Sequence, residues 1–333
     1  MNEITLRGTY SEMGEELGKL LHKSNYKPPP VPEERLELAR GCESALEEYA
    51  PSLLEEIDAV VEAGKYEETS LKAFELSLGP YPEWGCSIFA VSGNHTTTGN
   101  VIFARNYDWE SESQELFTVF RTYPEGALSS LTCTDLLVGR YGGINEAGLA
   151  IGLTAIPGSR RDHPGVMLHL VVRWVLDNCR TVKDAVAFIE KIPHVRGNNY
   201  LVADLQGDMA LVQACPENVE VVGPVDGLVA ATNHFQTSNM QAFEIDKYIP
   251  PSSVPRLEFI RKWFKNRRGK IDMPQAQSVL SGRLSTGDGV CQDIEWEGVR
   301  FATIWAWTYE TGRRSLQIAG GLPCEVDFEE FSF

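Results

Sequence analysis

W-G-C-S-I-F-A-V-S-G at residues 84–93 is followed by V-I-F-A-R-N-Y-D-W at residues 101–109. Both runs are rich in β-branched and aromatic residues and are joined by a turn-rich segment, so they predict an antiparallel hairpin. That hairpin would bring Cys86 and Asp108 to the same edge of a sheet. Arg105 would then either hold the Asp108 carboxylate or stabilise a Cys86 thiolate.

The cysteine at the start of this hairpin follows a glycine. Cleavage of the Gly85–Cys86 bond would free an α-amine on the residue that carries the thiol. The reference pKa of an α-amine is about 8, against about 10.4 for lysine, so near neutral pH the amine can act as a general base for its own thiol. The sequence therefore predicts a self-processing cysteine nucleophile, with Gly85 and Cys86 as the cleavage site.

The pattern of the chain changes at Cys86. Residues 1–85 have a short strand-like start and then helical patterns over 11–21, 34–64 and 70–78, and Pro51 is expected to kink or split the second of these. The strands expected after it are 86–92, 101–107, 116–123, 128–133, 139–144, 149–154, 200–203, 209–213, 219–222, 228–232, 300–308 and 315–319. The helices expected among them are 165–177, 182–192, 239–247, 254–266 and 273–280. This order indicates a layered α+β fold, with a helical segment over residues 1–85 and a main domain over residues 86–333.

Composition excludes several classes of function. The 333 residues carry a formal net charge of −17, which argues against nucleic acid or an anionic membrane as the partner. Seven cysteines lie without a C-x-x-C pair, so we expect a reducing compartment, no disulfide framework and no thiol-bound metal. Since the start M-N-E-I-T-L-R-G does not resemble a signal peptide and no apolar run reaches about 20 residues, we expect a cytoplasmic protein.

Three further residues are candidates for the site. Asn233 follows an apolar strand in V-A-A-T-N-H-F, where an amide can donate to a developing oxyanion. Thr154 ends G-L-A-I-G-L-T in a similar place, and its backbone or hydroxyl is a candidate second donor. Arg256 begins a helical pattern in S-S-V-P-R.

Motifs along nearly the whole chain resemble the cysteine-type N-terminal nucleophile hydrolases, in particular the acyl-coenzyme A:6-aminopenicillanic acid acyltransferase-like group. They are I-T-L-R-G-T-Y-S-E-M-G-E-E-L-G, G-C-S-I-F-A-V-S-G, A-R-N-Y-D-W, G-G-I-N-E-A-G-L-A-I-G-L-T, N-Y-L-V-A-D-L-Q-G-D, A-T-N-H-F, S-S-V-P-R and A-G-G-L-P-C-E. The resemblance implies a four-layer αββα sandwich with an N-terminal helical pro-segment, cleavage before the cysteine, and attack on a linear amide through a thioester. No metal or organic cofactor is implied, and the partner would be a small-molecule amide or acyl thioester.

The resemblance also implies roles for individual residues. Cys86 matches the nucleophile, Arg105 and Asp108 the residues that orient its thiol and amine, Asn233 the oxyanion-hole amide and Arg256 a supporting arginine. Thr154 matches a second active-site position. Two places depart from the family pattern: residues 281–292 read S-G-R-L-S-T-G-D-G-V-C-Q where the family tends to have D-H and P-x-S-I-C, and Gln213 replaces an acidic residue. Because we expect both to lie away from the nucleophile hairpin, we expect them to alter substrate choice more than mechanism.

Other readings remain at this point. A papain-like protease is disfavoured because Cys86 begins a strand-like run and not a helix, although Asn233 and His234 follow at a suitable spacing. An uncleaved, non-catalytic binding protein is a second alternative. If the protein is an enzyme, either water or an amine could accept the acyl group, so an acyltransferase remains an alternative to a hydrolase. The sequence also leaves a homo-oligomer open.

Overall fold

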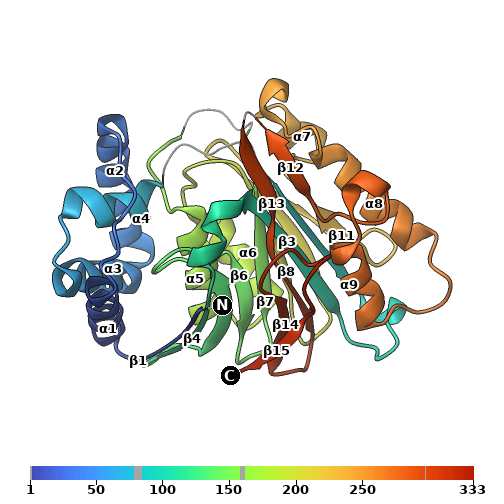
Figure 1. The fold of residues 1–333 in the computed structure, drawn as a ribbon, viewed down its shortest axis with the longest axis horizontal. Coiled ribbons are helices and arrows are strands. Elements are labelled where there is room, and N and C mark those ends of the chain that lie inside the picture. Colours follow the sequence, from blue (N-terminus) through green and yellow to red (C-terminus); the bar gives the residue numbers. More distant parts are fainter. Residues whose placement is uncertain (1, 79–84, 158–161, 297) are drawn as a thin grey trace.

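The computed structural model describes residues 2–78, 85–157, 162–296 and 298–333, which form two β-sheets with helices outside them (Figure 1). The eight-stranded sheet has, in spatial order, β1 (Asn2–Gly8), β4 (Thr118–Pro124), β5 (Ser130–Thr134), β6 (Gly142–Asn145), β7 (Ala150–Ala155), β8 (Asn198–Ala203), β9 (Met209–Ala214) and β10 (Val219–Val222). The seven-stranded sheet has β11 (Leu228–Ala231), β2 (Cys86–Val91), β3 (Ile102–Glu110), β13 (Val299–Glu310), β14 (Ser315–Ala319) and β15 (Glu329–Ser332), with β12 (Asp293–Trp296) also paired to β13.

The helices form the two outer layers of the main domain. They are α5 (Leu168–Asn178) and α6 (Val182–Lys191) on the first sheet, and α8 (Ser253–Lys265) and α9 (Met273–Ser281) on the second. Between the sheets, β2 packs against β7 and β8, and β11 packs against β8 and β9. The predicted α+β fold with four αββα layers is therefore confirmed.

Strand β2 shows how the sequence positions the site. All six of its residues are buried, because the strand has a layer on each face. Ile88 and Ala90 lie in the core between the sheets, whereas Phe89 and Val91 pack with the residues of α8 and α9. By the same alternation Cys86 belongs to the core between the sheets, and Ser87 points to the helical layer.

Residues 2–78 are joined closely to the main domain. Strand β1 pairs in parallel with β4, and the helices that follow gather at one side of the molecule (Figure 1). These helices are α1 (Tyr10–Lys23), α2 (Glu33–Tyr49), α3 (Pro51–Gly64) and α4 (Ala73–Ser77), with a π-helical turn over Glu68–Lys72. Pro51 is the first residue of α3 and splits the predicted long helix, as expected.

One buried contact and one partly buried contact connect these helices to α5. The Glu56 carboxylate of α3 accepts a 2.9 Å hydrogen bond from Arg173, and both side chains are fully buried. The Tyr10 hydroxyl of α1 donates to Asp177 over 3.0 Å. The N-terminal helices are thus part of the packed fold.

A few elements differ from the prediction. The helix expected over 239–247 is only α7 (Ser238–Gln241), followed by a 3₁₀ turn over Asp246–Tyr248. Strands β12 and β15 were not expected, because their acidic sequences D-I-E-W and E-E-F-S have little strand character away from their partners. No helix within the described ranges has the length and hydropathy that a membrane span needs.

Candidate active site

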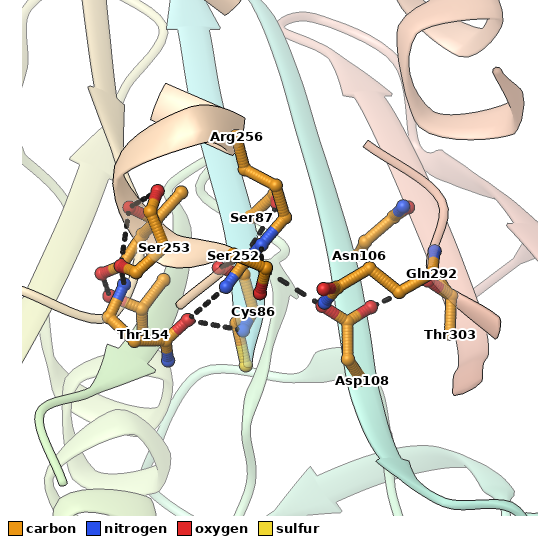
Figure 2. A network of polar contacts seen from close by, with 12 residues as sticks. Cys86, Ser87, Asn106, Asp108, Thr154, Ser252, Ser253, Arg256, Gln292 and Thr303 are labelled. Carbon is orange, nitrogen blue, oxygen red and sulfur yellow. Dashed lines mark hydrogen bonds and ion pairs between the residues drawn. The ribbon is translucent and has the colours of Figure 1, made fainter. Parts of the chain in front are cut away.

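The hairpin of β2 and β3 carries the candidate nucleophile. The two strands pair in antiparallel register with Cys86 opposite Tyr107, and the Asp108 N–H donates a 2.8 Å hydrogen bond to the Gly85 carbonyl. Cys86 and Asp108 therefore lie at the same edge of the sheet, as the sequence predicts (Figure 2). In this uncut chain, the carbonyl of the Gly85–Cys86 bond accepts from a backbone N–H.

Arg105 and Asp108 lie on opposite faces of β3, because they are three residues apart along a strand. Arg105 shares the face of Cys86: its Nη2 is 3.3 Å from the thiol sulfur, and its Nε donates to the Leu153 carbonyl over 3.0 Å. Asp108 is instead 3.7 Å from Arg256 Nη1. Of the two roles considered for Arg105, the geometry favours contact with the thiol.

Two side chains, in addition to Arg256, hold the Asp108 carboxylate. Its Oδ1 accepts from the Thr303 hydroxyl over 2.6 Å and its Oδ2 from the Gln292 amide over 2.5 Å (Figure 2). Burial raises the pKa of this carboxyl, against the opposing effect of Arg256 and the two hydrogen bonds. Gln292 belongs to the segment that departs from the family pattern, so the expectation that this segment lies away from the hairpin was wrong: chain folding brings it beside Asp108.

Asn233 lies just beyond the end of β11 and contacts the Cys86 nitrogen. Its Oδ1 accepts a 2.8 Å hydrogen bond from the Cys86 N–H and another of 2.9 Å from Arg256 Nη2. Its Nδ2 donates to the Ala155 carbonyl over 2.9 Å, and its own backbone N–H donates to the Ser253 hydroxyl over 2.8 Å. One N–H of the Asn233 amide therefore already has a partner in the uncut chain.

Arg256, in the first turns of α8, is fully buried and lies across the start of β2. Its Nη1 donates to the Cys86 carbonyl and, over 2.9 Å, to the Ser87 hydroxyl (Figure 2). A Cβ on Gly85 would lie 2.4 Å from Arg256 Nη2 and 3.0 Å from Asn233 Oδ1. Only glycine fits before the cysteine while these two side chains keep their places.

Thr154 and His234 lie behind the residues that contact Cys86. The Thr154 hydroxyl donates to the Thr232 carbonyl over 2.5 Å and accepts from Asn199 over 3.1 Å, so it supports the segment that leads to Asn233. His234 Nδ1 is 2.8 Å from the Ser253 hydroxyl, and burial lowers the pKa of His234 to about 4. Among the described contacts none joins His234 to Cys86, and Cys86 begins a strand, so the site is not papain-like.

Burial and the neighbouring charges both change the pKa of the Cys86 thiol. Cys86 is 5% exposed, and burial raises the pKa of its thiol. The charge of Asp108 raises this pKa further, whereas Arg105, Arg256 and a hydrogen bond from the Asp108 backbone lower it. The thiol is thus protonated near neutral pH and requires a base. Over the ranges that the structure describes, no three His, Cys, Asp or Glu side chains are grouped as metal ligands.

Several residues of this network were not singled out as candidates, among them Ser253, Gln292 and Thr303. Ser253 lies within the quoted S-S-V-P-R motif and could have been included. Thr303 is the register partner of Asp108 on β13, and such pairing is set by the sheet and not by the local sequence. Gln292 was missed because it lies far from Asp108 in the sequence, although the fold brings the two side chains together.

A cavity of about 220 Å³ opens beside Tyr107, the register partner of Cys86. It lies between the end of β3, the loop that follows β5, and the N-terminal helices. Its lining residues are Tyr26, Pro29, Phe74, Leu78, Tyr107, Trp109, Ser113, Leu116, Asp135, Leu136 and Tyr141. This is the candidate substrate cavity.

Solved structures that align with this chain include three enzymes. A variant of conjugated bile acid hydrolase from Clostridium perfringens aligns with 14% identity over 74% of this chain and 92% of its own, with a TM-score of 0.48. Penicillin V acylase from Agrobacterium tumefaciens aligns with 16% identity over 70% and 82%, with a TM-score of 0.40. An N-acylethanolamine-hydrolyzing acid amidase orthologue from Caenorhabditis elegans aligns with 14% identity over 67% and 92%, with a TM-score of 0.44.

Sequence comparison gives the assignment. No curated protein sequence matches this chain. The sequence model of one family, acyl-coenzyme A:6-aminopenicillanic acid acyl-transferase, matches residues 95–323. The match includes Arg105, Asp108, Thr154, Asn233 and Arg256, and begins nine residues after Cys86. It spans more than half of the chain, so this protein belongs to the acyl-coenzyme A:6-aminopenicillanic acid acyl-transferase family.

Proposed function

We propose that this protein is a self-processing amidohydrolase that cuts its own chain before Cys86 and then hydrolyses linear amides, not peptide bonds, through a Cys86 thioester. The observation that carries the proposal is the way three groups meet at one peptide bond. Asp108 N–H donates to the Gly85 carbonyl, Asn233 Oδ1 accepts from the Cys86 N–H, and Arg105 contacts the sulfur. The first of these is a ladder bond of the antiparallel pair, but a cysteine with only a structural role in a strand would need neither the Asn233 nor the Arg105 contact.

Self-cleavage follows from this arrangement. The Cys86 sulfur attacks the Gly85 carbonyl carbon, and the Asp108 N–H stabilises the negative charge that forms on the oxygen. The C–N bond then breaks, the Cys86 nitrogen takes up the thiol proton, and Gly85 is left as a thioester on sulfur. Water hydrolyses this thioester, which gives a Gly85 carboxylate, a free thiol and a free α-amine.

Turnover uses the same groups with an external amide. The α-amine, with a reference pKa of about 8, accepts the thiol proton, and the thiolate attacks the amide carbonyl. The Asn233 amide, which has a second N–H, and the Asp108 N–H are the oxyanion donors of the proposal. The leaving amine takes its proton from the Cys86 ammonium, and water resolves the acyl thioester. In this scheme Arg105 stabilises the thiolate, and Arg256 and Asp108 hold the amine end of Cys86.

Residues 1–85 are proposed to stay bound after cleavage as a small subunit of the 86–333 domain. Strand β1 is part of the eight-stranded sheet, and the buried Glu56–Arg173 pair joins α3 to α5. Tyr26, Phe74 and Leu78 line the candidate substrate cavity. Loss of this segment would expose a sheet edge and a buried charge, which is costly.

An acyltransferase is the second candidate, and membership of a family described by acyl transfer favours it. The first half-reaction is the same, and only the acceptor of the acyl group differs. A small-molecule amide or acyl thioester as substrate, and the cytoplasm as location, belong to the same proposal.

The test of the catalytic role is to trap the acyl-enzyme. Wild-type protein is mixed with p-nitrophenyl pentanoate, an activated ester, quenched in acid and analysed by intact mass. The proposal expects the pentanoyl group on the fragment that begins with Cys86, together with slow release of p-nitroaniline from pentanoyl p-nitroanilide. Cys86→Ala should neither process nor carry the acyl group, and processing or turnover by that variant would refute the proposal.

A further inference from the structure

Two thiols that the proposed mechanism does not use lie side by side. The sulfur atoms of Cys291 and Cys324 are 3.3 Å apart, and both cysteines are free. Because a disulfide bond is about 2.05 Å long, a relative shift of about 1 Å would allow these sulfurs to bond. Cys324 belongs to the motif A-G-G-L-P-C-E near the end of the chain, to which the proposed function gives no role. The pair is therefore a candidate for oxidation.

The two thiols differ in their access to solvent. Cys291 is 2% exposed, whereas Cys324 is partly exposed in the turn between β14 and β15. Redox-sensitive sites in proteins combine an accessible cysteine with a second cysteine next to it, which resolves the first oxidation product. A solvent-borne oxidant would thus meet Cys324 first, and Cys291 lies where the resolving thiol must be.

A cationic side chain lies beside this pair. Arg283 donates a 2.7 Å hydrogen bond to Glu325, the residue that follows Cys324. The pKa of Arg283 is raised by that hydrogen bond and also by the charges of Cys324 and Cys291, so the guanidinium is close enough to interact with both sulfurs. A guanidinium in this place stabilises the negative charge that a thiolate carries when it attacks a disulfide.

The buried thiol of the pair is adjacent in sequence to the network around Asp108. The Cys291 N–H donates a 2.9 Å hydrogen bond to the Gly282 carbonyl, which fixes the backbone at this point. The next residue, Gln292, donates its side-chain amide to the Asp108 carboxylate over 2.5 Å and its N–H to the Thr303 hydroxyl over 3.0 Å. A bond between the two sulfurs would therefore tie the turn after β14 to the segment that holds Asp108.

We propose that low-molecular-weight disulfides oxidise Cys291 and Cys324 to a reversible disulfide, which braces the segment that holds Asp108. The Cys324 thiolate attacks one sulfur of the small disulfide, forms a mixed disulfide and releases one thiolate. Cys291 then loses its proton and attacks the Cys324 sulfur, which releases the second thiolate. The protein pair loses two electrons, the small disulfide gains them, and the two thiol protons pass through solvent to the released thiolates.

The first experiment counts free thiols. Wild-type protein is equilibrated at pH 7.5 with either oxidised glutathione or dithiothreitol, quenched in acid, denatured and labelled with N-ethylmaleimide for intact mass. The reduced protein should carry seven labels in total and the oxidised protein five, and dithiothreitol should restore the two that are lost. A tryptic digest of the oxidised protein should contain the peptides of Cys291 and Cys324 joined to each other.

Three variants identify the thiols. Cys324→Ser should carry six labels in both buffers. Cys179→Ala, which removes a buried thiol on the other sheet's helical side, should still fall from six labels to four on oxidation, and so should Cys86→Ala. Seven labels on the wild type in both buffers, a stable glutathione adduct on Cys324, or a two-label loss that persists in Cys324→Ser would each overturn the inference.

The second experiment measures whether the bond braces the segment beside Asp108. Amide hydrogen exchange is compared between the oxidised and reduced forms of Cys86→Ala. Residues 282–292 should exchange at least about threefold more slowly in the oxidised form, because a covalent tie suppresses local opening, while α6 should exchange equally in both. Equal exchange of residues 282–292 in the two forms would contradict the brace. Neither experiment uses catalysis, so the inference is tested separately from the proposed function.

Discussion

The backbone N–H of Asp108 donates a 2.8 Å hydrogen bond to the carbonyl oxygen of Gly85, the residue just before the candidate nucleophile. On the neighbouring strand β13, Thr303 is the register partner of Asp108, and its hydroxyl donates to the Asp108 carboxylate. The backbone of Asp108 thus contacts the bond that would be cut, and its side chain belongs to the network of Thr303, Gln292 and Arg256. The reactive geometry follows from strand register more than from any single side chain.

Gly85 should be required for self-cleavage. In Gly85→Ala the new methyl group would lie 2.4 Å from Arg256 Nη2, so either the arginine or the scissile bond must move. We expect processing to slow at least tenfold, measured by gel densitometry during expression and after purification. Gly223→Ala is the control, since a Cβ there meets nothing within 4 Å, and it should process at the wild-type rate. Normal processing of Gly85→Ala would contradict the geometry described for this bond.

Arg105 should set the reactivity of the thiol. Its Nη2 lies 3.3 Å from the sulfur, and an opposite charge this close shifts a pKa by about 1–3 units. Arg105→Gln should therefore move the pH profile of iodoacetamide alkylation at Cys86 to higher pH by about that amount. Arg121→Gln, which changes an arginine that is 19% exposed and paired with Glu3, should leave the profile in place. An unchanged profile in Arg105→Gln would remove the arginine from contact with the thiol.

Asn233 should matter for rate more than for folding. Asn233→Ala removes the acceptor of the Cys86 N–H and one proposed oxyanion donor, and loss of such a donor costs about 10²–10³ in kcat. Circular dichroism should be close to wild type, while turnover of the p-nitroanilide substrate falls by that factor. Wild-type turnover by this variant would exclude Asn233 from catalysis.

The ion pair of Glu56 with Arg173 should stabilise the packing of the N-terminal helices against the rest of the fold. Glu56→Gln leaves the fully buried Arg173 with Asp177 as its one remaining carboxylate among its described partners, and breaking a buried pair costs about 3–5 kcal/mol. The free energy of unfolding is measured by urea titration in the uncut Cys86→Ala background. Glu55→Gln, its exposed neighbour, should change that free energy by less than about 0.5 kcal/mol. Equal effects of the two variants would mean that the ion pair does not hold the segment.

His194 should make the protein less stable in acid. Burial lowers its pKa to about 4, below the value of about 6.5 expected in the unfolded chain, and its Nε2 donates to the Ile189 carbonyl. Between these two pH values the unfolded state binds more protons, so stability present above pH 6.5 is lost as pH falls towards 4, by up to about 3 kcal/mol.

The comparison that isolates this effect is wild type against His194→Gln, both in the Cys86→Ala background. The difference in unfolding free energy between pH 7.5 and pH 4.5 should be smaller in His194→Gln. A pH dependence equal to that of wild type would show that other groups cause the acid sensitivity.

Much of this architecture could be predicted because it depends on local patterns. The hairpin of Cys86 and Asp108, the break at Pro51 and the layer order follow from alternation, proline chemistry and element sequence. Strand alternation alone also predicts that Arg105 and Asp108, three residues apart, lie on opposite faces of the strand. What could not be predicted is which distant segments meet at the site, since Gln292 and Thr303 reach Asp108 through strand β13 and the loop before it. Asp135, which lines the candidate substrate cavity, is a second case, because a loop residue has no periodicity that indicates its neighbours.

The central claim is that the Gly85–Cys86 bond is cut by the protein itself. The most direct measurement is the intact mass of freshly purified protein under denaturing conditions, beside the Cys86→Ala variant. The account predicts two species for the wild type, residues 1–85 and residues 86–333 with a free amine on Cys86, which elute together from a size-exclusion column before denaturation. A single wild-type chain of 37.0 kDa that stays intact for days would contradict it, because Cys86 would then have no amine to activate its thiol.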